Sequence, residues 1–144
     1  MIYVAVWAAF CASFHGMLNR INDLSYSIIG CAIEVHRILG PGMLESTYQK
    51  SLEHELTLAG LRVDKEVPVA LCYKSLTIER AYFIDLLVED LIVVELKVAE
   101  SLRPEHEAQT LTYLKHGGYQ LGLLINFNEP RLKSGIRRVV HHLY

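Results

Sequence analysis

Two strongly apolar segments, residues 82–88 and 91–98, are separated by only two residues, Glu89 and Asp90. Segments of this length and composition, without a helical period, predict β-strands. So short a connection predicts an antiparallel hairpin, although Glu-Asp is not a favoured turn pair. Any fold for this chain must therefore place a nearly continuous apolar hairpin inside a sheet.

The segments around this hairpin predict helices and three further strands. Apolar residues recur every three or four positions from Ile21 to Leu39, which predicts an amphipathic helix that ends at Gly40-Pro41-Gly42. Pro68 indicates that the strand containing it, Val63 to Tyr73, lies at a sheet edge or contains a bulge. Further helices are expected from Leu44 to Ala59 and from Leu102 to His116, and further strands from Val63 to Tyr73, Tyr119 to Phe127 and Ile136 to His142. The order ααβββαβ, with a short final strand, predicts an α/β (α+β) fold with a mixed sheet flanked by helices.

The length and charge of the chain restrict its class. At 144 residues the chain has the size of one domain with a single core. A formal net charge of -2 argues against a histone-like or arm-type nucleic-acid binder, because such binding needs a surplus of Lys and Arg. The charge leaves open an enzyme that binds a phosphate backbone through one local patch and a metal ion.

The three cysteines, Cys11, Cys31 and Cys72, have neither a CxxC nor a Cys-His spacing. A structural zinc site is therefore not expected. Their odd number argues against a disulfide framework and indicates a reducing compartment, so we expect a cytoplasmic protein.

The N-terminus, residues 1–16, is almost wholly apolar and carries no Asp, Glu, Lys or Arg. It is shorter than the about 20 apolar residues of a membrane-spanning helix and lacks the basic start of a secretory signal. Three interpretations are open: a weak signal or anchor, an extra helix or strand laid on the core, or an upstream extension of the gene model. Because Met17 begins a sequence typical of a soluble protein, we favour the extension and expect one domain over residues 17–144. We expect no membrane association unless the apolar segment is exposed.

Acidic residues occupy positions in the hairpin where a charge is costly. Asp85 lies within the first apolar strand and Glu95 within the second, followed at the second next position by Lys97. Residues i and i+2 face the same side of a strand, so Glu95 and Lys97 project together. A two-residue turn places Asp85 opposite Val94, within one residue of Glu95, and a one-residue bulge would bring both carboxylates to one face.

Two carboxylates and a lysine inside a sheet are unfavourable as isolated charges, and a divalent cation would offset that cost. Carboxylate-rich sites favour Mg²⁺ or Mn²⁺, which activate water and neutralise charge on a phosphodiester. The alternative is a structural ion pair between Glu95 and Lys97 at a strand end, which is the commoner meaning of a single E-x-K.

Further polar residues lie on predicted helices. Glu45 is three residues before Tyr48, on the same stripe as buried apolar residues, and it also fits an exposed acid at a helix N-terminus. Gln109 and Tyr113 are four apart and therefore adjacent on one helix face. Tyrosines such as Tyr48 and Tyr113 are able to stack on unpaired bases, although more often they pack in the core with the hydroxyl satisfied.

Together these residues resemble a known family. The segment Gly42-Met-Leu-Glu45-Ser-Thr-Tyr48 is similar to the signature of the GxxExxY family. Similar blocks occur in family order between about Leu24 and His141, namely residues 33–42, Asp85-Leu-Leu-Val88, Val94-Glu-Leu-Lys97, His106-Glu-Ala-Gln109-Thr-Leu-Thr-Tyr113 and residues 121–127. The family is placed in the PD-(D/E)xK nuclease superfamily, near its lambda-exonuclease-like branch, which implies a restriction-endonuclease-like fold.

The resemblance also implies roles for individual residues. Glu45, Asp85 and Glu95 would bind Mg²⁺ or Mn²⁺, and Lys97 would be the catalytic lysine, acting with Asp85, Glu95 and Gln109. Gln109 and Tyr113 would position the substrate or the attacking water, and Tyr48 would also contact the substrate.

The implied function is metal-dependent hydrolysis of phosphodiester bonds in DNA, with RNA as a second substrate class. Two alternatives remain open at this point: a catalytically silent member that binds nucleic acid or a protein, and a metal-dependent hydrolase that is not a nuclease. The resemblance also implies a homo-oligomer, since compact exonucleases of this superfamily often form rings or dimers.

Overall fold

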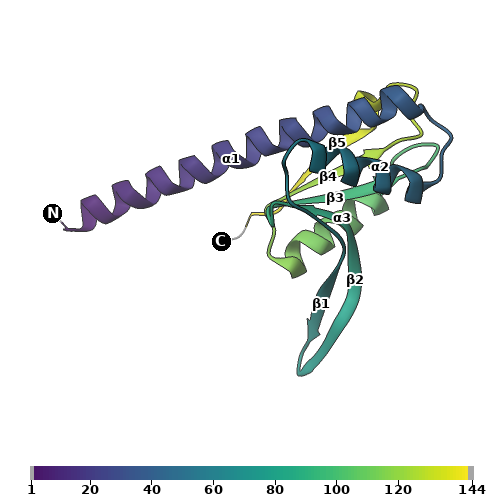
Figure 1. Ribbon diagram of the computed structural model, residues 1–144. Helices are drawn as coiled ribbons and strands as arrows, with labels where there is room; N and C mark the ends of the chain where they lie inside the picture. Colours follow the sequence, from purple (N-terminus) through teal and green to yellow (C-terminus); the bar gives the residue numbers. More distant parts are fainter. Residues whose placement is uncertain (1, 143–144) are drawn as a thin grey trace.

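The computed structural model describes residues 2–142 and shows a mixed sheet with helices on both faces (Figure 1). Met1, which belongs to the predicted extension, and Leu143 and Tyr144, which belong to the predicted domain, lie outside the described residues. In chain order the elements are α1 (Ile2–Leu39), α2 (Glu45–Leu58), β1 (Val63–Tyr73), β2 (Leu76–Val88), β3 (Ile92–Lys97), α3 (Pro104–Gly117), β4 (Leu121–Asn126), the 3₁₀ helix η1 (Leu132–Gly135) and β5 (Ile136–Val140).

The five strands follow the chain order β1-β2-β3-β4-β5 across the sheet. Strands β3 and β4 are parallel, with α3 as the connection between them, and the other neighbours are antiparallel. The prediction of a mixed α/β fold is thus confirmed, and the arrangement is consistent with a restriction-endonuclease-like fold. Pro68 lies on β1, an edge strand whose register shifts between Val69 and Leu71, as its position in the sequence predicted.

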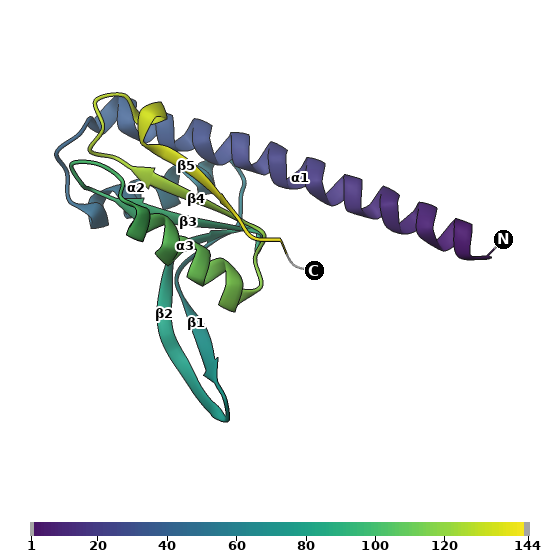
Figure 2. The same cartoon turned by 180° about the vertical axis from the view of Figure 1, so that it is seen from behind.

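Several element boundaries differ from the predictions. Strand β2 begins at Leu76, six residues before the predicted start, and forms with β1 a hairpin that extends beyond the rest of the sheet (Figure 2). Strand β5 ends at Val140 and not at His142. The short helix η1 was not predicted, because four residues are too few to show a helical period.

Helix α1 begins far earlier than the predicted Ile21. It runs without a break from Ile2 to Leu39, and its N-terminal half projects from the domain (Figures 1 and 2). This half contains several alanines and lacks proline, so nothing in it interrupts a helix. Among the described residues, none of the helices combines the length and the apolar character that a membrane crossing requires.

The helices cover opposite faces of the sheet. The C-terminal half of α1 and all of α2 pack on one face, where a core cluster includes Ile28, Leu52 and Val94. Helix α3 covers the other face with a smaller cluster that includes Val93 and Leu114. Strand β3 is consequently buried on both sides, which explains why its sequence is apolar throughout except at Glu95 and Lys97.

Tyr48 belongs to this core, and the prediction that it contacts substrate is wrong for this structure. Its side chain is fully buried, and its ring stacks on Phe127 with centroids 4.4 Å apart. The hydroxyl donates a hydrogen bond to the carbonyl of Gly40 and accepts one from the backbone N–H of Met43. A ring packed in this way has no free face for a base, so Tyr48 instead fixes the loop between α1 and α2.

Replacing Tyr48 with phenylalanine is expected to lower the free energy of unfolding by about 0.5–1.5 kcal/mol, because the part-buried hydrogen bonds of its hydroxyl to the backbone of Gly40 and Met43 would be lost. Chemical denaturation followed by circular dichroism measures this change. The exposed Tyr26, replaced in the same way, is the control and should change stability by less than about 0.5 kcal/mol. Equal effects in the two variants would contradict the anchoring role of the hydroxyl.

Candidate active site

Asp85 and Glu95 lie level with each other on neighbouring strands. The last paired residues of β2 and β3 are Leu86 and Val94, and continuing this register by one residue places Asp85 opposite Glu95. The predicted register, with Asp85 opposite Val94, is therefore wrong by one residue. The connection uses three residues because Leu91 belongs to the turn, and its N–H bonds to the carbonyl of Val88 at 3.0 Å.

The two carboxylates replace the backbone ladder where β2 and β3 separate. The N–H of Asp85 donates to Oε1 of Glu95 at 3.0 Å, and the N–H of Leu96 donates to Oδ2 of Asp85 at 2.8 Å. Each side chain thus accepts a backbone hydrogen bond from the other strand. This exchange holds both carboxyl groups at the point of divergence.

The alternation of side chains along β2 is broken at the same place. Ile84 and Leu87, which are three residues apart, both pack in the cluster under α3, whereas Leu86 packs on the opposite face. In a regular strand, residues three apart face opposite sides. The irregular backbone around Asp85 directs a carboxylate toward Glu95 from a strand whose neighbouring side chains are buried.

The surroundings of these carboxyl groups favour their protonated forms. Burial raises the pKa of Glu95 to about 8, and the nearby charge of Asp85 adds to the shift. Burial likewise raises the pKa of Asp85, although the hydrogen bond from Leu96 opposes this change. A buried Glu95 whose charge is disfavoured both by burial and by the half-buried Asp85 beside it forms an environment that a cation would stabilise.

Lys97 and Gln109 lie beside the two carboxyl groups and are joined by a hydrogen bond. Lys97 lies two residues after Glu95 on β3, and its Nζ donates a hydrogen bond to Oε1 of Gln109 on α3 at 3.2 Å. Tyr113 lies one turn further along the same helix, with its side chain near that of Gln109. Burial and the charges of Glu95 and Asp85 raise the pKa of Tyr113 to about 12, so its hydroxyl remains a proton donor beside the carboxylates.

Glu45 lies near Asp85 and Lys97 and comes from α2, on the face of the sheet opposite α3. It is the first residue of α2 and its side chain as a whole is exposed. Partial shielding of its carboxyl and the charge of Asp85 raise its pKa, whereas Lys97 and the backbone of Val98 lower it. Glu45 therefore lies within electrostatic range of Asp85 and Lys97, at the margin of the site.

The donor chemistry of this group fits a divalent cation, but its side chains do not form a complete ligand set. Carboxylate oxygens from Asp85, Glu95 and Glu45 are the ligands that Mg²⁺ and Mn²⁺ prefer. Within residues 2–142, no group of three or more His, Cys, Asp or Glu side chains is arranged closely enough to hold a metal ion. Glu45 would need to turn inward, or water and substrate oxygens would need to supply the remaining ligands.

Three residues that support the site were not predicted from the sequence. Gln49, one turn after Glu45 on α2, donates from Nε2 to the carbonyl of Asp85 at 3.0 Å. Glu66 on β1 adds a negative charge near Asp85 and has a φ of 50°, which is unusual for a residue other than glycine. The four-residue spacing of Glu45 and Gln49 places both on one helix face, and this spacing could have identified Gln49 from the sequence. Nothing in the sequence indicates the unusual backbone conformation of Glu66.

The third residue, Asn126, is fully buried at the end of β4, beside Lys97 on β3. Its Oδ1 accepts a hydrogen bond from the N–H of Ala99 at 3.1 Å, and its Nδ2 donates to the carbonyl of Ala99 at 2.9 Å. Asn126 thereby holds the chain that leaves β3 directly after Lys97. Asn126 is a polar residue inside the apolar segment 121–127, just as Asp85 and Glu95 are inside their strands, so the same criterion could have identified it from the sequence.

A comparison with protein families matches a large part of the chain. A family model described as the PD-(D/E)XK nuclease superfamily matches residues 22–139. The matched range contains every candidate site residue and leaves out the projecting half of α1. No curated protein and no solved structure matches the chain.

Proposed function

The chain belongs to the PD-(D/E)XK nuclease superfamily, and from this premise we propose that it is a Mg²⁺- or Mn²⁺-dependent nuclease that hydrolyses phosphodiester bonds of DNA. The observation that carries the proposal is the pairing of Asp85 with Glu95 where β2 and β3 diverge, with Lys97 beside them. The GxxExxY signature at residues 42–48 supports a finer placement in that family, near the lambda-exonuclease-like branch.

In this proposal the acidic residues hold the metal and the other polar residues position the reacting groups. A bound divalent cation supplies charge neutralisation at the phosphodiester and lowers the pKa of a bound water. Asp85 and Glu95 contribute ligand oxygens from the two strands, and Glu45 contributes a third by turning inward from the start of α2.

Lys97 presents a fixed positive charge on the same face as Glu95, where it stabilises the additional negative charge of the transition state. Gln109 and Tyr113 are suited to orienting the attacking water or a phosphate oxygen. Gln109 accepts a hydrogen bond from Lys97, so a contact from α3 sets the position of the lysine. DNA is the proposed substrate, with RNA as the second class to be tested.

Metal binding is the first property to measure. Titration calorimetry of the full chain with Mg²⁺ and Mn²⁺ should show binding that Asp85→Asn and Glu95→Gln each weaken at least about 10–100-fold, the range caused by losing even an indirect partner of a metal site. Both replacements keep an oxygen that accepts the cross-strand hydrogen bond, so the fold should be retained. Glu79→Gln, an exposed acid near the far end of the β1–β2 hairpin, is the matched control and should bind like the wild type.

The outcomes distinguish the proposal from its alternative. Binding that depends on Asp85 and Glu95, together with cleavage of DNA, supports the nuclease. Absence of metal binding by the folded wild type, both alone and with added DNA, would contradict the proposal and favour a silent member that binds nucleic acid or protein. DNA must be included because its phosphate oxygens are able to complete the ligand set.

A further inference from the structure

The N-terminal half of α1 carries large apolar side chains into solvent. We define the N-terminal stripe as Trp7, Phe10, Phe14 and Met17, which are 69%, 68%, 42% and 45% exposed. Soluble monomers rarely expose contiguous apolar surface of this kind unless it binds something. The stripe lies outside the region matched by the superfamily model and far along the chain from the candidate active site.

The stripe continues the core-facing side of the same helix. From Trp7 to Met17 its residues are spaced by three, four and three positions, and the same alternation leads on to Ile21, Leu24 and Ile28. These last three side chains are buried against the sheet. One helix face thus packs on the domain over its C-terminal half and lacks a partner over its N-terminal half among the described residues. An alternation of three and four is the spacing of a helix that pairs with another helix.

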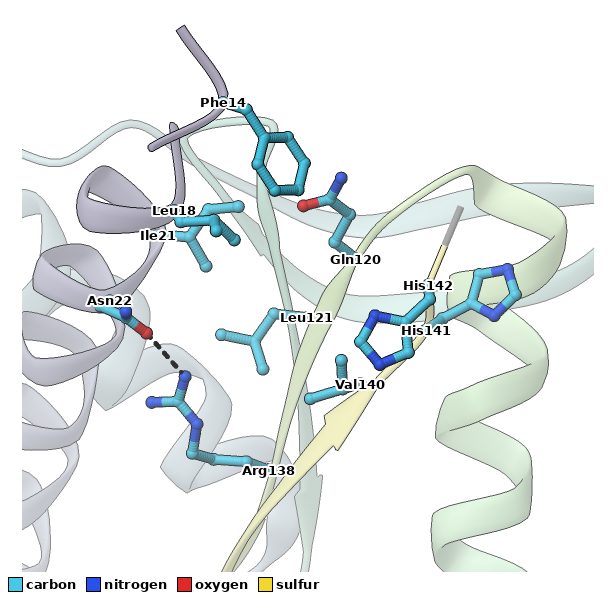
Figure 3. Close-up of a pocket in the computed structure, with 10 residues that line it drawn as sticks. All are labelled: Phe14, Leu18, Ile21, Asn22, Gln120, Leu121, Arg138, Val140, His141 and His142. Carbon is cyan, nitrogen blue, oxygen red and sulfur yellow. Dashed lines mark hydrogen bonds between the residues drawn. The ribbon is translucent and has the colours of Figure 1, made fainter. Parts of the chain in front are cut away.

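The direction of the projecting half is fixed by polar contacts. Arg138 on β5 donates to Oδ1 of Asn22 at 3.1 Å (Figure 3). It also donates to Oγ of Ser25 at 2.8 Å, and the two bonds tie α1 to the sheet edge. Beside this contact, Phe14, Leu18 and Val140 line an apolar pocket where α1 leaves the sheet (Figure 3). Because Phe14 belongs to both, the stripe and the pocket form one apolar surface, which is tied to the sheet at the pocket end.

From this surface we infer that the chain forms a homodimer in which the N-terminal halves of two α1 helices pair antiparallel through the stripe. With Phe10 opposite Phe14 of the second copy, Trp7 lies opposite Met17 of the second copy. The N-terminal end of each helix then covers the pocket of the other copy. A parallel pair would place both domains at the same end of the helices and leave the two pockets uncovered.

The area and charge of the surface favour a second copy as the partner. The four side chains of the stripe present on the order of 500 Å² in each chain, so two paired copies would bury about the 1,000 Å² in total that a specific interface needs. No Asp, Glu, Lys or Arg precedes Arg20, so two copies of the segment do not repel each other. The same lack of basic residues disfavours adsorption to an anionic membrane surface, which usually requires Lys and Arg on the helix.

The test is the mass of the full chain in detergent-free solution, measured by light scattering after size exclusion. The wild type should have about twice the 16.4 kDa mass of one chain. Phe10→Glu with Met17→Glu should halve this mass, because each chain would bury two charges in the seam. Ala5→Glu with Ala12→Glu is the matched control, since it adds the same charges at the same seven-residue separation on the opposite side of the helix, and it should remain dimeric.

Three results would overturn the inference. They are a wild-type mass of one chain, a mass above two chains, and a dimer that persists in the Phe10→Glu, Met17→Glu variant while this variant unfolds cooperatively on heating. Sedimentation with phosphatidylcholine and phosphatidylglycerol vesicles is measured in parallel. Vesicle binding by a monomeric wild type that is lost in the stripe variant would identify a lipid surface as the partner instead.

Discussion

Replacing Lys97 with methionine is expected to reduce the rate of metal-dependent DNA hydrolysis about 10²–10³-fold, the effect of removing one preorganised charge-stabilising group. Methionine keeps the length and apolar stem of the side chain and removes the ammonium that bonds to Gln109. Because Lys97 is not a proposed ligand, metal binding should be retained. The measurement is the cleavage rate of labelled linear DNA under saturating Mg²⁺ or Mn²⁺.

Lys133→Met is the control for this prediction. Lys133 is exposed on η1, and its replacement removes the same charge from the chain. Its cleavage rate should match that of the wild type. If Lys97→Met cleaves DNA as fast as the wild type, Lys97 is a structural partner of Gln109 and the assigned chemistry is incorrect.

The second large effect is expected in the stability of the metal-free protein. Glu95→Gln should raise the free energy of unfolding near pH 8 by roughly 1–3 kcal/mol relative to the wild type, and change it little near about pH 4. The pKa of Glu95 is about 8 in the folded protein, compared with 4.5 for an ordinary glutamate. Between these values the folded wild type holds a proton that the unfolded chain has released, so stability falls as pH rises through this window. Glutamine has no ionisable proton, so the variant does not lose stability at this position as the pH rises.

Urea unfolding in the presence of a chelator, repeated across this pH range, measures the difference. Asp85 remains in the variant, and its raised pKa continues to contribute a loss of stability with rising pH. The profiles should therefore diverge with pH, although neither is flat. Glu79→Gln should follow the wild-type profile. Parallel profiles for the wild type and Glu95→Gln would show that the carboxyl is not held in an unfavourable environment for its charge.

The sequence by itself determined the strand interiors and the residues within them that are costly to bury. Asp85, Glu95 and Lys97 were identified because a charge inside an apolar strand is visible in a window of a few residues. The boundaries of α2, β1, β3, α3 and β4 were also predicted to within about two residues, since each ends at a turn signal or a change of period. These features depend on local chemistry alone.

Only the tertiary structure decided how these parts meet. The turn includes Leu91, and the resulting register of β2 and β3 places Asp85 opposite Glu95. The position of Tyr48 in its helix is compatible both with core packing and with a substrate contact. Its stacking on Phe127, which lies 79 positions later in the chain, shows that it packs in the core. The link between Asn126 and the segment after Lys97 joins two strands that are adjacent only in space. Such contacts depend on which distant segments pack together, and neither the period nor the composition of a single segment contains that information.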